Sequence, residues 1–166
     1  MKPSAFSLGT LLLTLLAQFV FAQTQDRSHA AGVAERGDHV MGFDHAKTTH
    51  HFRLTKTGGR IEVEANDADD TESRDQIRMH LGHIARMFSE GNFDAPMLIH
   101  DRVPPGMPEM KKRRGAVRYE VEETSRGGRI VISTKNPRAR AAVHEFLRFQ
   151  IRDHGTGDSV EVGSGN

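Results

Sequence analysis

The chain contains no cysteine and no tryptophan, and it has one tyrosine among its 166 residues. Without cysteine it forms no disulfide, no thiolate nucleophile, no cysteine-based zinc site and no covalently attached c-type haem. Its folded part must therefore be held by an apolar core, or by a bound ligand or metal ion. An excess of one charge is also missing, since 23 Lys and Arg face 22 Asp and Glu. This balance argues against general nucleic-acid binding, which needs a basic footprint.

Familiar catalytic signatures are absent as well. The chain has no P-loop, no dinucleotide fingerprint, no Gly-x-Ser-x-Gly and no His-Glu-x-x-His. His144-Glu145 begins like the last of these motifs, but Arg148 stands where the second histidine is needed. The motifs therefore leave open whether the protein is an enzyme.

One long uncharged apolar run is present, and it lies close to the N-terminus over residues 8–21. Lys2 precedes it, and Val20 and Ala22 have the small-residue spacing that signal peptidase accepts. The run is shorter than the roughly 20 residues of a membrane-spanning helix. Residues 1–22 therefore predict a cleaved signal peptide and an exported protein, periplasmic or secreted, with no stable membrane span after cleavage.

Composition divides the rest of the chain. Residues 23–40 are polar and aperiodic and predict a flexible leader, and residues 156–166 predict a flexible tail. Residues 41–155 between them are expected to form a single domain.

This domain consists of two similar halves. Apolar and polar residues alternate over 50–65 and again over 117–132, and the tetrapeptide Gly-Gly-Arg-Ile occurs at 58–61 and at 127–130. Alternation around a Gly-Gly pair is typical of a β-hairpin with the glycines in the turn. Each half therefore begins with a predicted hairpin.

A helix is predicted after each hairpin. The first begins near Ser73, which has capping-box spacing to Gln76, and it ends at Gly91. The second has Asn136 as its N-cap and Pro137 in its first position. Both carry an apolar stripe at helical spacing: Ile77, Leu81, Ile84 and Phe88 in the first, and Val143, Phe146, Leu147, Gln150 and Ile151 in the second.

The expected fold is a two-layer α+β domain. Duplicated β-β-α units (49–91 and 116–155) would form a four-stranded antiparallel sheet with both helices on one face, since each unit has one apolar sheet face to bury. The order of the strands stays open. The connection 92–115 holds four of the six prolines, and a short strand is expected over 97–99. So long a connection is often functional.

Histidine is unusually abundant, with ten in the chain. His80 and His83 lie at i and i+3 of the first predicted helix, and Met87 follows on the same side. Alternation turns His50 towards the core and His51 outwards, so His50 is expected to approach the helix histidines. These residues are candidate metal ligands; two half-exposed histidines on an amphipathic helix are the alternative.

Methionine adds a soft donor to this set. His45 precedes the first strand, and Met107 and Met110 lie in the proline-rich connection. Thioether with imidazole suits copper, particularly Cu(I), better than zinc or magnesium. The alternative is that these methionines fill gaps in the core. The first functional hypothesis is therefore an exported metal-binding or metal-handling protein, with copper as the expected cofactor.

Two other hypotheses remain. A structural or interaction domain would bind a protein partner through residues 95–110. An enzyme would use His80, His83 or His100 as acid and base, beside Asp44 or Asp101.

Four stretches carry a resemblance: 41–52 (MGFDHAKTTHHF), 73–88 (SRDQIRMHLGHIARMF), 95–106 (APMLIHDRVPPG) and 143–158 (VHEFLRFQIRDHGTGD). They resemble a family of small exported bacterial proteins without an established function, over about residues 40–158. Some members of that family bear the name aspartate carbamoyltransferase. The motifs here do not support this activity, because the Ser-Thr-Arg-Thr phosphate loop is absent and the chain is too short for two α/β domains. The resemblance transfers no active-site residue.

Overall fold

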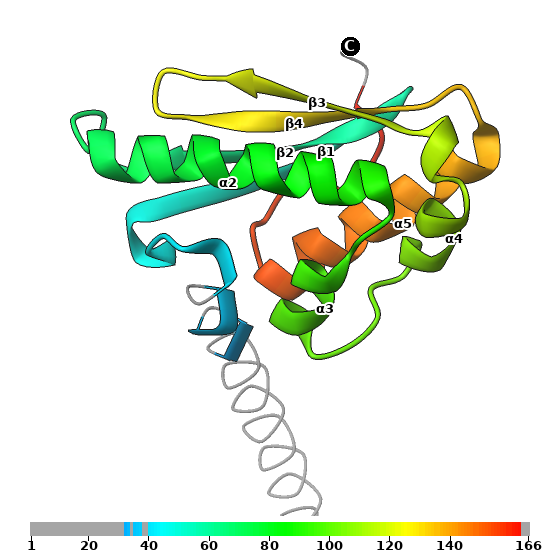
Figure 1. The fold of residues 1–166 in the computed structure, drawn as a ribbon, viewed down its shortest axis with the longest axis horizontal. Coiled ribbons are helices and arrows are strands. Elements are labelled where there is room, and N and C mark those ends of the chain that lie inside the picture. The colour runs from blue at the N-terminus through cyan, green and yellow to red at the C-terminus, as the bar shows by residue number, and fades with distance from the viewer. Residues whose placement is uncertain (1–31, 34, 38–39, 164–166) are drawn as a thin grey trace, which may run out of the picture.

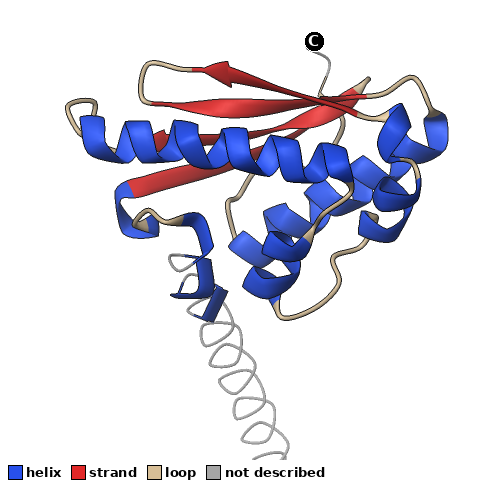
Figure 2. Ribbon diagram, in the orientation of Figure 1, coloured by secondary structure: helices blue, strands red, loops and turns tan. Residues whose placement is uncertain are grey.

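The structure is a computed structural model and describes residues 32–33, 35–37 and 40–163. The predicted signal peptide and most of the predicted leader lie outside these residues. The described chain forms a two-layer α+β domain, with an antiparallel sheet above and helices below (Figures 1 and 2). The fold class expected from the sequence is confirmed.

The sheet contains four strands in the order β1-β2-β4-β3. They are β1 (Thr48–Thr55), β2 (Gly58–Ala65), β3 (Arg118–Glu123) and β4 (Gly127–Ser133). The two hairpins meet through β2 and β4, where Ile61 of the first Gly-Gly-Arg-Ile pairs with Ile130 of the second. This central pairing answers the question of strand order that the pattern left open.

The two long helices pack on the same face of the sheet (Figure 1). Helix α2 (Thr71–Glu90) contacts β4, β3 and β2, and α5 (Pro137–His154) contacts β1 and β2. The apolar stripes predicted for both helices are buried. Gly91 ends α2, as expected, and the Asn136 side chain caps α5, as expected; Gly91 and Gly155, which ends α5, both adopt the left-handed conformation.

The glycine pairs do not form the hairpin turns, so that prediction is wrong. Gly58-Gly59 begin β2 and Gly127-Gly128 begin β4, after turns at Lys56-Thr57 and Ser125-Arg126. A Cβ on Gly59 would lie 2.1 Å from Leu147 Cδ1 of α5, and one on Gly127 would lie 2.2 Å from the Val63 carbonyl oxygen. The glycines therefore permit close packing of the strands and of α5 on the sheet.

Two further local predictions are corrected. Asp70 is the N-cap of α2 and accepts a hydrogen bond from the Ser73 backbone N–H, so Ser73 is the third helical residue instead of the cap. The strand expected over 97–99 is part of helix α3 (Asp94–His100). Pro96 stands in the first turn of α3, where its missing N–H costs no helical hydrogen bond.

The connection between the halves is ordered throughout. It contains α3, α4 (Met107–Lys112) and the short 3-10 helix η2 (Arg114–Ala116). Met107 and Met110 are buried in the hydrophobic core. Helices α3 and α4 thereby close the lower layer beside α5 (Figure 1).

The segment expected to be a flexible tail runs beside β1 up to residue 163. Asp158 accepts hydrogen bonds from the Phe52 backbone N–H at 2.9 Å and faces His51 Nδ1 at 3.0 Å. Val162 forms a parallel bridge with Leu54. These contacts cover the β1 edge of the sheet.

Candidate functional site

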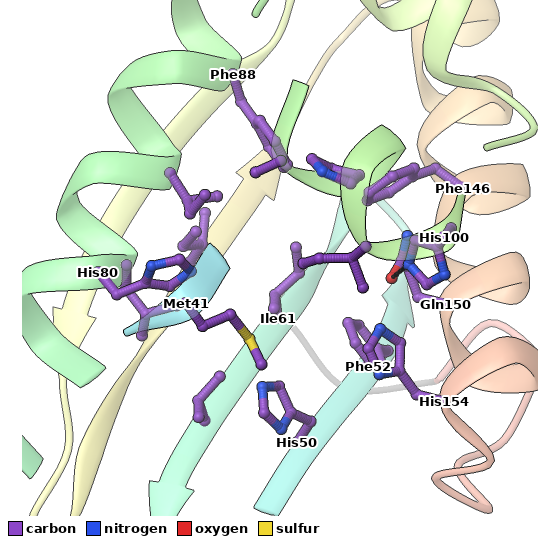
Figure 3. Close-up of a pocket in the computed structure, with 17 residues that line it drawn as sticks. Met41, His50, Phe52, Ile61, His80, Phe88, His100, Phe146, Gln150 and His154 are labelled. Atoms are coloured by element: carbon purple, nitrogen blue, oxygen red, sulfur yellow. Dashed lines mark hydrogen bonds between the residues drawn. The ribbon is translucent and has the colours of Figure 1, made fainter. Parts of the chain in front are cut away.

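An apolar pocket lies between the sheet and the helices, where α2, α3 and α5 converge (Figure 3). Four imidazoles line it, and each comes from a different element: His50 from β1, His80 from α2, His100 from α3 and His154 from α5. The rest of its wall is mainly apolar and includes Phe52, Ile61, Ile84, Ile99, Ile130 and Phe146. Its volume of about 70 Å³ is far below the 300–1,000 Å³ of ordinary ligand pockets, so it admits an ion or a very small molecule.

His50 is the most unusual of these histidines. Burial lowers its pKa to about 4, with a smaller contribution from His80, so the ring is neutral at pH 7. Its Nε2 atom is buried and has no hydrogen-bond partner in the described part of the chain. The ring stacks against Phe43, with 6.0 Å between ring centroids. A buried polar atom without a partner is costly, and at a pocket wall it points to a ligand.

The pocket holds two other neutral imidazoles. Burial lowers the pKa of His80 to about 4, aided by His83, and lowers that of His154 to about 3, aided by His100 and His50. The ring centroids of His50 and His154 are 5.9 Å apart. The rings are stacked at an interplanar angle of 12°, so one of them has to turn about its side-chain bonds for both to bind one metal ion.

Met41 adds sulfur to the site. Its side chain also lines the pocket, and Figure 3 shows it reaching between His80 and His50. Met41, His50 and His154 additionally border a second, more polar cavity of about 260 Å³, with His45 and Asp153 on its wall. These three side chains therefore stand where the apolar pocket meets a wider cavity.

His100 belongs to a separate buried network. Its Nδ1 lies 2.5 Å from Asp153 Oδ2, its Nε2 lies 2.9 Å from Gln150 Oε1, and Arg102 pairs with the other Asp153 oxygen. The His100 and Asp153 side chains are 1% and 6% exposed. Both ring nitrogens are therefore engaged by other side chains of the protein. Neither nitrogen is free to take a proton from a substrate, and the partner is Asp153 instead of the Asp44 or Asp101 expected for an enzyme.

The structure brings together some of the predicted ligands and separates others. His50 and His80 share the apolar pocket, and His45 lies on the adjoining cavity. His83 is exposed, and Arg86 donates to its Nδ1 at 3.1 Å. The three remaining candidates, all methionines, pack with the core: Met87, Met107 and Met110.

Sequence reasoning did not place Met41 or His154 at the site, assigned Gln150 only to the buried stripe, and considered His100 only as the acid or base of an enzyme. For His154 a signal was available, because it follows Gln150 by one helical turn and Gln150 belongs to the predicted buried stripe. Met41 and His100 lie outside periodic segments, where no pattern predicts the direction of a side chain.

Taken over the described residues, no three His, Asp or Glu side chains come together closely enough to hold a metal ion. A closed site of the kind that structural zinc requires is therefore not formed by these residue types alone. Methionine is not among these residue types, so a site with the Met41 sulfur as one of its donors is a separate case.

None of the described helices combines the length and apolarity needed to cross a bilayer.

Comparison with known proteins found no match to a family model, to a curated protein or to a solved structure.

Proposed function

We propose that the protein binds one Cu(I) ion at the mouth of the apolar pocket, through His50, His154 and Met41. The observation that carries the proposal is the buried, unpartnered Nε2 of His50. A metal ion would satisfy this atom, and the neutral rings of His50 and His154 need lose no proton to bind it. His80 lines the same pocket and is the alternative third or fourth ligand.

Copper fits better than the other common metals. Imidazole with thioether is a soft donor set, and the site has too few carboxylates for magnesium or calcium. The surrounding wall is apolar, and burying a singly charged ion costs less than burying a doubly charged one. Export of the domain, expected from residues 1–22, would bring it to the compartment in which bacteria handle much of their copper.

The test is anaerobic titration of the metal-free protein with Cu(I) against a chromogenic competitor. The wild-type protein is expected to bind one equivalent, and His50→Ala to bind at least about tenfold more weakly. His83→Ala is the matched control and is expected to bind like the wild type, because His83 is exposed and away from the pocket. Uptake well below one equivalent by the wild type, or equal affinities for His50→Ala and wild type, would contradict the proposal.

A second candidate function is partner binding through residues 95–110. Two large aliphatic side chains of this region are exposed, Leu98 at 62% and Val103 at 56%. Deleting the segment is a poor test because Met107 and Met110 belong to the core. The substitutions Leu98→Lys and Val103→Lys should instead abolish cross-links to a partner in extracts of the source organism while leaving the fold intact. Cross-links that persist in both variants would remove this candidate.

A further inference from the structure

The pocket has a second unsatisfied polar atom, on the α5 side and distinct from the proposed copper ligands. Gln150 is 4% exposed and lines the pocket. Its side-chain Nε2 is buried and has no hydrogen-bond partner in the described ranges. Figure 3 shows Gln150 beside His100 on the α5 side, away from His80 and Met41.

The amide lies against a buried network, with its oxygen turned towards His100. Gln150 Oε1 lies 2.9 Å from His100 Nε2, and His100 Nδ1 lies 2.5 Å from Asp153. Arg102 in turn pairs with Asp153. With Oε1 turned towards the imidazole, Nε2 faces an otherwise apolar enclosure without a hydrogen-bond partner in the described residues. A buried donor of this kind needs an acceptor.

We infer that the pocket binds a small neutral carbonyl compound whose oxygen accepts a hydrogen bond from Gln150 Nε2. The alkyl part of the compound contacts the apolar wall formed by residues such as Phe52, Ile99 and Phe146. The volume of about 70 Å³ restricts the compound to a few heavy atoms. A neutral compound suits this wall, because the lining is mainly apolar and His100 is already paired with Asp153.

This inference does not depend on copper, and its test uses the full-length protein stripped of metal with a chelator. The probes are 2-butanone and 2-methyl-1-butene, which have the same shape and differ in having C=O or C=CH₂. Binding is measured by NMR titration of the wild type, of Gln150→Met and of Arg152→Met. The Arg152→Met control alters an exposed position of the same helix.

The two probes differ in hydrophobicity, so the quantity compared between variants is the ratio of ketone affinity to alkene affinity. The difference in hydrophobicity contributes equally to this ratio in each variant. This ratio is expected to be at least about fivefold higher in the wild type and in Arg152→Met than in Gln150→Met. The side-chain amide protons of wild-type Gln150 should also shift with the ketone and not with the alkene, which gives a readout that needs no folded variant. Equal ratios in all three proteins, or an unshifted Gln150 amide at saturating ketone, would overturn the inference.

Two readouts on the wild type separate the two proposals. Cu(I) uptake by the metal-free protein reports on the copper site, and the shift of the Gln150 side-chain amide with ketone, measured without metal, reports on the carbonyl site. Absence of Cu(I) uptake alone therefore leaves the carbonyl site standing, and an unshifted Gln150 amide alone leaves the copper proposal standing.

Discussion

His80 illustrates how burial of a neutral imidazole links stability to pH. Its pKa in the folded protein is about 4, against 6.5 for the free side chain. Between these two values the unfolded chain binds a proton that the folded protein does not, so stability falls as the pH drops below about 6.5. At pH 5 the loss is about 2 kcal/mol for one such residue. His50 and His154, with pKa values of about 4 and 3, act in the same direction.

We therefore expect the free energy of unfolding to decrease between pH 7 and pH 5 in urea denaturation experiments. His80→Leu should reduce that decrease by about 2 kcal/mol, because it removes one of the groups that titrate. The comparison with the wild type isolates His80 from carboxylates, most of which titrate below this window. An identical pH dependence in both proteins would show that His80 is not held neutral by burial.

Two glycines make a matched pair for testing close packing. A Cβ at Gly59 would lie 2.1 Å from Leu147 Cδ1 and 2.6 Å from the Arg53 carbonyl oxygen, whereas a Cβ at Gly82, on the exposed side of α2, meets nothing within 4 Å. Gly59→Ala should destabilise the protein by about 1–3 kcal/mol through overpacking. Gly82→Ala should stabilise it by about 0.5–1 kcal/mol, since alanine is the better helix former. Thermal unfolding of the two variants gives the signs, and equal effects would contradict the assignment.

Among the elements, the segment after α5 is held beside β1 by Asp158, by the Arg148 side chain at the Val160 carbonyl, and by the Gly163 N–H at the Leu54 carbonyl. Asp158 accepts hydrogen bonds from the Phe52 N–H and the Thr156 hydroxyl, and these contacts and His51 keep the pKa of its carboxyl low despite partial burial. Asp158→Ala should release residues 156–163 and cost about 1 kcal/mol. Hydrogen exchange should show faster exchange at the Phe52 amide. Unchanged protection there would mean that the Arg148–Val160 contact and the Val162–Leu54 bridge are sufficient to hold the segment.

The first hairpin and α3 show where element prediction from sequence succeeds and fails. Alternation correctly predicted that His50 faces inwards, since a period of two leaves no other register for Phe52 and Leu54 to be buried. Gly-Gly was assigned to the turn because glycine suits turns, but here the absence of a side chain serves close strand and helix packing. Helix α3 was missed because a short apolar run has no periodicity that separates a strand from a helix.

For the whole molecule, the duplication was sufficient to predict the fold class, although not the strand order. Each β-β-α unit exposes an apolar face that a second copy covers, and the Gly-Gly-Arg-Ile repeats mark the strands that meet at Ile61 and Ile130. The candidate site was only partly predictable. Its four imidazoles come from β1, α2, α3 and α5, and their convergence depends on how the three helices cross beneath the sheet. That crossing is set by tertiary packing, which residue spacing does not encode.

The central claim is that the pocket mouth holds copper through imidazole nitrogen and the Met41 sulfur. X-ray absorption spectroscopy at the copper edge of the Cu(I)-loaded protein tests it most directly. The expected spectrum of the wild type shows nitrogen scatterers and one sulfur scatterer, and the sulfur contribution disappears in Met41→Leu. A wild-type spectrum without sulfur, or a sulfur contribution that persists in Met41→Leu, would contradict the claim.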